Sequence, residues 1–329
     1  MIITRAILEI LDYRSGVNQI SNKELDLSSD TTIEYLLKIL KKVNESPNRK
    51  RGAFVPESKF QKKLEEYKAA SIPFVDFASE ITKDLNIVLQ GLDDKYAIDL
   101  LIAEYREEEA TYFSIVFLEN KESITHTVVN NDGVLENKIV KNFSILPSSS
   151  INLNTFVTIG LDDFIVYSQE KPRKISNEEH RVLEEYIESV FALSNNETYR
   201  MIKNVTSKVC EDHGVNPAIA MTKIKSFLAE QPEVKAMSPE EISKKAFESE
   251  LAIEDFNAKM HTKGIVDNIN LDHEYVLKKA VNHKIKTDTG IEITFPSDLY
   301  QDDKHLEFIE EEDGTISIKI KAVNKIINR

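Results

Sequence analysis

The 329-residue chain carries 42 lysines and arginines against 56 aspartates and glutamates, which gives it a formal charge of -14. Affinity for nucleic acid comes largely from lysine and arginine displacing counterions from phosphates, so this balance argues against a general polyanion binder. With 41% hydrophobic residues and no uninterrupted apolar run, the composition excludes a disordered chain and a membrane span. It predicts a globular protein long enough for two domains.

Two features of the sequence bear on its compartment. The apolar stretch at the N-terminus contains Arg5, Glu9 and Asp12 and has no small-residue cleavage site, unlike a signal peptide. Cys210 is the only cysteine, which excludes an internal disulfide and is typical of a reducing compartment. We therefore expect a cytoplasmic protein that is not associated with a membrane.

The first ninety residues combine strands with helices. Alternation of apolar and polar residues predicts strands over residues 2–12 and 23–27. Apolar residues at helical spacing, with Ser, Asp or Pro at the starts, then predict helices over 31–45, 56–70 and 74–90. The basic stretch between the first two helices is expected to be a loop.

A β-rich stretch follows, in which residues of high strand propensity alternate with charged or Asn-Asp-Gly turns. We expect four strands and then two shorter ones, at 96–106, 110–120, 123–131, 134–143 and within 156–171. These strands predict an antiparallel sheet covered by the preceding helices, and so an α+β domain over residues 1–192.

The rest of the chain is mainly helical. Ser176 and Glu179 have the spacing of a capping box, which predicts a helix over 176–193 that leaves the first domain. Further helix starts are indicated at Asn216-Pro217 and Ser238-Pro239. Alternation returns near the C-terminus and predicts a small antiparallel sheet, so the second domain is expected over residues 193–329.

No motif in the sequence predicts a metal, a cofactor or catalytic residues. The seven histidines never share a helical turn, and nine glycines form neither a dinucleotide-binding fingerprint nor a P-loop. One enzymatic alternative remains, because metal-dependent nucleases place an acid on one strand and an acid-x-Lys pair on the next. Asp99 followed by Glu119 and Lys121, or by Glu136 and Lys138, has this pattern.

The strongest functional feature is a basic segment between Lys38 and Lys63, with nine basic residues against two acidic ones. Such a concentration of charge would steer a phosphate backbone or an acidic protein toward one helix-loop-helix. The alternative is an ordinary solvated face, in which lysines offset a helix dipole or lie beside glutamates. The candidate nucleic-acid-binding residues are Lys41, Lys42, Arg49, Lys50, Arg51, Lys62 and Lys63.

Acidic residues also cluster, at 105–109 (YREEE) and 310–313 (EEED). In turns such residues mostly keep strand edges soluble and unpaired. They could also meet a basic DNA-handling protein, in which case the chain would be an adaptor and its association with DNA would be indirect.

Three stretches together resemble one family: IEYLLKILKKVNESPNRKRGAFVPES from residue 33, PFVDFASEITKDL from residue 73, and GIEITFPSDLYQDDKHLEFIEEEDGTISIKI from residue 290. They are similar to bacterial nucleoid-associated proteins of the YejK or NdpA type, and the similarity covers nearly the whole chain. The resemblance implies a cytoplasmic protein of the nucleoid that contacts DNA or DNA-bound proteins. The resemblance implies no catalytic residue at any position of this chain.

Together these observations predict a non-enzymatic protein that binds DNA weakly and without sequence specificity through a basic face of its N-terminal domain. The acidic adaptor is the alternative, and the metal-dependent nuclease is the third hypothesis. A homodimer would suit a protein that bridges or clamps DNA, although no self-complementary surface is visible in the sequence.

Overall fold

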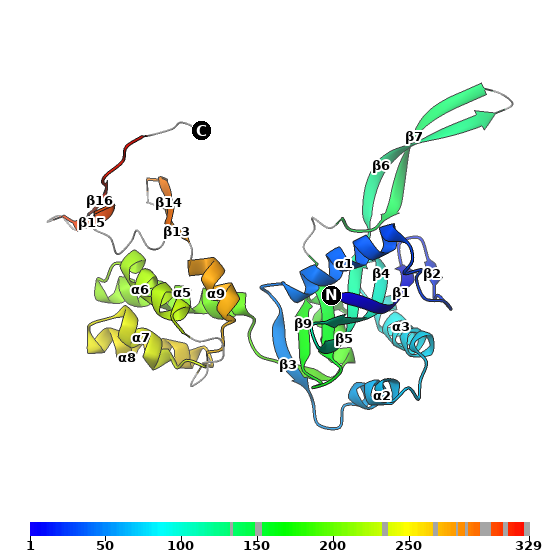
Figure 1. The fold of residues 1–329 in the computed structure, drawn as a ribbon, viewed down its shortest axis with the longest axis horizontal. Helices are drawn as coiled ribbons and strands as arrows, with labels where there is room; N and C mark the ends of the chain where they lie inside the picture. Colours follow the sequence, from blue (N-terminus) through cyan, green and yellow to red (C-terminus); the bar gives the residue numbers. More distant parts are fainter. Residues whose placement is uncertain are drawn as a thin grey trace. The chain divides into compact units, whose positions relative to one another are not determined.

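The computed structural model divides the chain into two compact units, Met1–Ser194 and Asn195–Arg329. Strands and helices alternate in the first unit, whereas the second begins with helices and ends in two small hairpins (Figure 1). The α+β class, with its N-terminal antiparallel sheet and its terminal small sheets, is therefore confirmed. The structure describes residues 1–131, 134–148, 153–231, 236–265, 269–280, 282–286, 289–296, 304–311 and 315–325.

An eight-stranded antiparallel sheet forms the centre of the first unit, in the order β12-β3-β9-β8-β5-β4-β1-β2. Most residues of strands β4 and β5 are buried, because both faces of the sheet are covered where they lie. The strands are β1 (Ile2–Asp12), β2 (Val17–Gln19), β3 (Lys50–Phe54), β4 (Ala97–Glu107), β5 (Ala110–Glu119), β8 (Thr155–Gly160), β9 (Val166–Glu170) and β12 (Ser189–Phe191).

Two separate cores lie on the two faces of this sheet. Helix α1 (Asp30–Asn44) packs on one face, where Leu40 shares a core with Leu101 and Phe156. The other face carries α2 (Lys59–Lys68), α3 (Phe74–Gln90) and α4 (Val182–Tyr186). Successive side chains of a strand point to opposite faces, so neighbours such as Leu100 and Leu101 belong to different cores. The helices thus cover both faces of the sheet.

The strand predicted at 23–27 is wrong. Its backbone shows one hydrogen bond to the sheet, from Leu25 N to Ala6 O at 2.8 Å, and its leucines pack beside α1. The strand that extends the sheet beyond β1 is β2 instead, whose three residues are all exposed. The alternation of apolar and polar residues over 23–27 therefore arises from a loop whose leucines pack against the core.

The helix predicted over 176–193 is also wrong. Residues Ser176 and Asn177 have φ of 54° and 67° and form the turn between β10 (Arg173–Ile175) and β11 (Glu178–His180). Their backbone N–H groups donate to the Asp93 carboxylate at 2.9 and 2.8 Å. This contact with a distant residue favours a two-residue hairpin over the expected capping box. Only the short helix α4 forms in the segment, followed by strand β12.

Among its described residues, the second unit has five helices, which pack around one core that includes Ile202, Ile224 and Phe256. Both helix starts expected from the sequence are confirmed: the Asn216 side chain caps one helix, and Ser238 opens another with a capping box. No described helix has the length and apolarity needed to cross a membrane. The helices are α5 (Asn195–His213), α6 (Pro217–Ala229), α7 (Pro239–Ala246), α8 (Glu250–Thr262) and α9 (His273–Ala280).

Besides the β10–β11 turn, the described residues form three two-stranded hairpins. In the first unit, β6 (Lys121–Asn131) and β7 (Val134–Ile145) form a long ribbon that projects away from the sheet (Figure 1). The hairpin expected around the Asn-Asp-Gly turn is confirmed, but its two strands form a separate sheet and do not join the main sheet as expected. In the second unit, the hairpins are β13 (Asn282–Lys286) with β14 (Glu292–Pro296) and β15 (Leu306–Glu310) with β16 (Ile316–Ile320).

Candidate nucleic-acid interface

The basic stretch expected to be a loop is strand β3, which lies between β9 and β12. Gly52 permits this close pairing, because a Cβ there would lie 2.3 Å from the Val190 carbonyl oxygen and 2.5 Å from the Phe191 ring. A strand directs successive side chains to opposite faces. Lys50 and Arg51 therefore enter different environments, and the expected basic helix-loop-helix is replaced by a helix-strand-helix.

Lys50 points to the face that α4 covers and is only 13% exposed. Its Nζ lies 2.6 Å from Oε1 of Glu184 and 5.0 Å from the centre of the Phe191 ring. The Ser168 hydroxyl donates to the same carboxylate oxygen at 2.8 Å. This lysine is enclosed and neutralised, so it is not positioned to meet a phosphate.

Arg49 and Arg51 lie on the opposite, outward face of the same segment. Arg51 is exposed and is the direct cross-strand partner of Tyr167. The Arg49 guanidinium lies 4.3 Å above the Tyr167 ring, a distance typical of cation–π stacking. Within the part of the chain that the structure describes, neither guanidinium has a carboxylate within 4.0 Å.

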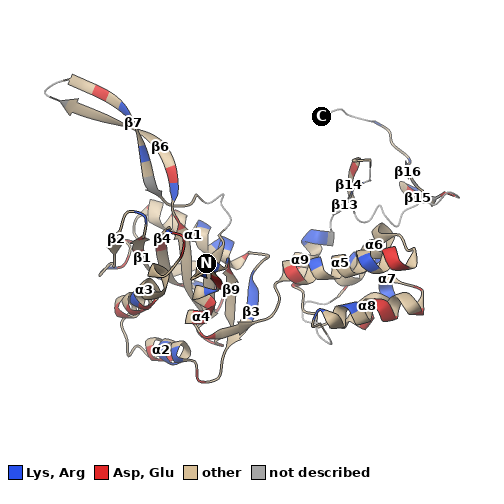
Figure 2. Cartoon of the chain, turned by 180° about the vertical axis from the view of Figure 1, so that it is seen from behind, with Lys and Arg blue, Asp and Glu red and all other residues tan. Residues whose placement is uncertain are grey.

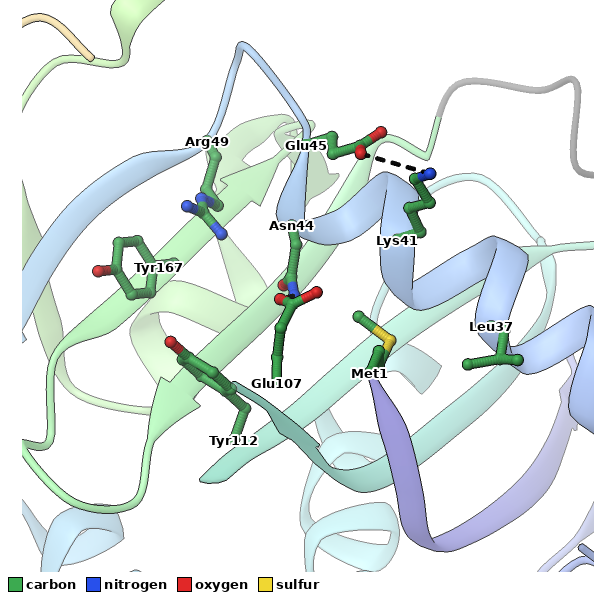
Figure 3. A pocket seen from close by; sticks show the side chains of 9 residues that line it. All are labelled: Met1, Leu37, Lys41, Asn44, Glu45, Arg49, Glu107, Tyr112 and Tyr167. Atoms are coloured by element: carbon green, nitrogen blue, oxygen red, sulfur yellow. Dashed lines mark hydrogen bonds and ion pairs between the residues drawn. The ribbon is translucent and has the colours of Figure 1, made fainter. Parts of the chain in front are cut away.

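A cavity of about 550 Å³ separates Arg49 from the C-terminal end of α1 (Figure 3). Lys41 on one rim pairs with Glu45 at 3.8 Å, and Lys42 lies half-exposed in the same helical turn. The Asn44 amide donates to Glu107 Oε2 at 2.5 Å. The cavity is lined by Met1, Leu37, Lys41, Asn44, Glu45, Arg49, Glu107, Tyr112 and Tyr167. Its wall thus carries two cations and two carboxylates.

Lys62 and Lys63 lie on α2, across the sheet from α1. Lys62 contacts the Glu57 carboxylate, while Lys63 contacts Glu80 and lies 3.7 Å from Asp84. The hydrogen bonds that the two lysines donate to Glu57 and Glu80 raise the pKa of both lysines. The seven candidate residues therefore do not form one surface: Lys41, Lys42, Arg49 and Arg51 lie on the α1 face, and the other three are paired elsewhere.

The nuclease pattern does not assemble around Asp99. In the register of β4 and β5, Asp99 lies opposite Leu118, so it and Glu119 point to opposite faces of the sheet. The Asn120 amide donates to Asp99, and Glu119 accepts from the buried Arg173 at 2.7 Å. Within the described residues, no three His, Cys, Asp or Glu side chains are grouped to hold a metal ion.

The second acid-x-Lys pair and the two acidic clusters lie apart from that site. Glu136 and Lys138 pair with each other on the ribbon at 3.0 Å. Of the first acidic cluster, Glu107 faces the cavity, and Glu108 lies in the β4–β5 turn with φ of 54°. The second cluster reaches into residues 312–314, which lie outside the described residues.

Sequence reasoning missed two groups of charged residues. Glu170 is buried under α4, where it accepts the backbone N–H groups of Leu183 and Glu184, and its burial raises the pKa to about 7. In the helical unit, burial and the nearby Lys203 and Lys279 lower the pKa of Lys225. These groups come from elements far apart in the sequence, and no local pattern predicts them.

The chain was compared with known families and with curated proteins. A family model described as nucleoid-associated protein YejK matches residues 7–328 of the chain, which is nearly its whole length. No curated protein matches. The family suggested by the three resembling stretches is confirmed, and the match includes both compact units. The chain belongs to the family of the nucleoid-associated protein YejK.

Proposed function

We propose that the protein binds the DNA backbone weakly and without sequence specificity through the α1 face of its N-terminal unit. Lys41, Lys42, Arg49 and Arg51 would contact phosphates there, and no base edge would be read. Membership of a nucleoid-associated family supports a role on the nucleoid. No catalytic step is part of the proposal.

The observation that carries this proposal is the position of Arg49 and Arg51. Both guanidinium groups lie on the outward face of one short segment, without a carboxylate partner among the described residues. Arginine is suited to phosphate because its planar group donates several hydrogen bonds at once. The Tyr167 ring beneath Arg49 limits the freedom of that side chain before any ligand arrives.

The expected affinity for DNA is low because nearby carboxylates and the net negative charge of the chain repel phosphate. Glu45 and Glu107 line the same cavity as Lys41 and Arg49. The whole chain has a formal charge of -14, which repels a polyanion at long range when salt is low. Contact should therefore depend on the local face, and it should weaken as salt rises.

The test is the affinity for a labelled duplex as a function of salt concentration. Replacing Lys41, Arg49 and Arg51 by Ala together removes three cations from the α1 face. We expect the slope of log K against log salt to fall by about 0.9 for each lost phosphate contact, thus by about 3. The matched control replaces Lys59, Lys62 and Lys63 by Ala, with the same change of charge on α2, and should leave the slope unchanged.

The same titration distinguishes the adaptor. An adaptor would show no binding to the duplex at physiological salt until a basic DNA-handling protein is added. Equal losses in the two triple variants would contradict the proposal as well, because they would reflect total charge and not the α1 face.

A further inference from the structure

The ribbon of β6 and β7 is held to the first unit at both of its ends. β6 continues from β5 through Asn120, whose amide donates to Asp99 at 3.0 Å and whose backbone N–H donates to Ala97 O at 2.9 Å. After β7, the Pro147 carbonyl accepts from the Tyr35 hydroxyl of α1 at 3.1 Å. These contacts fix the base from which the ribbon projects (Figure 1).

One face of this ribbon carries an exposed apolar stripe. The strand register places four branched side chains on the same face, and each is a diagonal neighbour of the next across the two strands. They are more than half exposed: Ile124 at 75%, Ile139 at 83%, Val128 at 58% and Leu135 at 70%. We call these four residues the apolar stripe.

The opposite face of the ribbon exposes less apolar surface: Val134 is 68% and Val140 36% exposed, and Val129 is half-buried. Near its base, Thr125 and Val140 line a hollow of about 670 Å³ together with Asp12 and Arg14 of the β1–β2 region. Farther out this face carries the ion pair of Lys138 with Glu136. Glu122 and Lys141, the latter the cross-strand partner of Ile124, also line this hollow, whereas none of the four residues of the apolar stripe does.

An exposed apolar stripe on an isolated two-stranded ribbon indicates that another surface packs against it. Two strands alone are marginally stable in water, and contiguous exposed apolar side chains on a soluble protein mark an interaction site. The ribbon has two open edges, which in a β protein invite pairing or packing with another chain. The remaining question is what covers it.

The charge of the ribbon favours a second copy of the chain. Residues 121–145 contain three basic and three acidic residues, so the segment is neutral within a chain of charge -14. Two copies would repel each other elsewhere but not along this ribbon, where basic and acidic residues are interspersed (Figure 2). Between Ile124 and Asn130 the register places one lysine, Lys141, on the stripe face, and it pairs with Glu122 at 2.5 Å. This face therefore lacks the excess of cations by which proteins bind a phosphate backbone.

The size of the ribbon is sufficient for this contact. Eleven residues at about 3.4 Å each, with strands about 4.8 Å apart and side chains beyond them, present a face of roughly 500 Å². Two such faces would bury about 1,000 Å², the lower limit for a specific protein interface. The expected dimer is therefore of modest affinity and depends on protein concentration.

We propose that two copies of the protein pack ribbon to ribbon through the apolar stripe. The contact is isologous, so the same four side chains serve both copies about a two-fold axis. This inference does not depend on DNA binding, since the stripe and the α1 face share no residue.

The test is the monomer–dimer equilibrium of the full chain, measured by sedimentation without DNA. Ile139→Glu places a charge in the apolar stripe of both copies, and we expect the dissociation constant of the dimer to increase at least about a hundredfold. Val134→Glu introduces the same charge at a 68% exposed valine of the opposite face, and should change it less than about threefold. Both side chains are exposed, so thermal unfolding should match the unaltered protein.

A cross-linking experiment gives a second measurement. The native thiol Cys210 is buried, so a new cysteine on the ribbon supplies the reactive group. Asn137→Cys, on the stripe face opposite Val128, should form a disulfide-linked dimer, and Thr127→Cys on the other face should not. A monomer at all concentrations, a dimer unaffected by Ile139→Glu, or equal cross-linking from both faces would overturn the proposal. Weaker duplex binding by Ile139→Glu than by Val134→Glu, measured at protein concentrations where the unaltered protein is a monomer, would also overturn it, because nucleic acid would then cover the stripe.

Discussion

The two faces of the eight-stranded sheet place cations of the basic segment in different surroundings. On the face covered by α2, α3 and α4, Lys50 is enclosed with Glu184, and Lys63 is paired with Glu80 and Asp84. On the face covered by α1, the guanidinium groups of Arg49 and Arg51 lack carboxylate partners among the described residues. A run of basic residues in a sequence is therefore not yet a basic surface.

The difference between Lys50 and Arg51 arises from a single step along a strand. Both residues belong to β3, but the two-residue period directs one toward the core and the other toward solvent. A buried ammonium needs a partner because the charge loses its hydration, and Glu184 supplies this partner. An exposed guanidinium keeps its hydration and remains able to meet a phosphate.

The largest expected effect concerns the enclosed pair. Glu184→Gln leaves the Lys50 charge buried without its partner, and we expect the free energy of unfolding to fall by about 3 to 5 kcal/mol. Urea unfolding of the full chain measures this loss of stability. Adding Lys50→Met to the Glu184→Gln variant should recover much of it. A loss below about 1 kcal/mol, as for a surface pair, would mean that Lys50 reaches water and that the two faces do not differ.

The next effect concerns Glu170, on the same face as Lys50. Its pKa is raised from 4.5 to about 7, so the folded state favours the protonated form. The resulting stability is fully present below pH 4.5 and is lost as pH rises through about 7, a change of about 3 kcal/mol. Glu170→Gln should remove this dependence from unfolding free energies measured between about pH 5 and 8. An unchanged pH profile would contradict the burial of this carboxyl group.

A smaller effect is expected on the outward face. Arg51→Ala should weaken duplex binding several-fold and reduce the salt slope by about 1, because one phosphate contact is lost. The free energy of unfolding should change by less than about 0.5 kcal/mol, since the side chain is exposed. The comparison with Lys50→Met is decisive: if that variant, while folded, lowers the slope as much as Arg51→Ala, then both faces of β3 contact DNA.

The smallest effect is expected at Lys62. Its partner Glu57 lies on the surface, and such exposed pairs contribute little to stability because solvent screens them. Lys62→Ala should therefore leave both the unfolding free energy and the salt slope of duplex binding unchanged. A measurable loss of slope would place α2 in the interface and restore the single basic face that the sequence suggested.

Elements with strong local patterns were predictable. The apolar spacing of α1 and α3, the residues of high strand propensity in β4 and β5, and the helix-start signal at Ser238-Pro239 each lie within one segment. The hairpin at Asn131 was predictable because its turn residues favour the conformation that the flanking strands need. For these elements a local preference and the tertiary structure agree.

Elements that depend on distant partners were not predictable. Strand β3 has five residues, three of them Lys, Arg and Gly, and it forms because β9 and β12 lie on either side of it. The capping pattern at Ser176 was overridden by hydrogen bonds to Asp93. In both places a tertiary contact outweighed a weak local preference.

For the candidate interface, the sequence by itself determined where the cations are concentrated, that the whole chain is acidic, and that the family is the nucleoid-associated one. Only the tertiary structure decided which cations remain without a partner, because neutralisation requires a carboxylate within a few ångströms of the charge. Glu184 reaches Lys50 through the folding of the sheet, and no spacing along the chain predicts that meeting. The surface available to DNA is thus a property of side-chain direction and neighbours, and composition alone does not specify it.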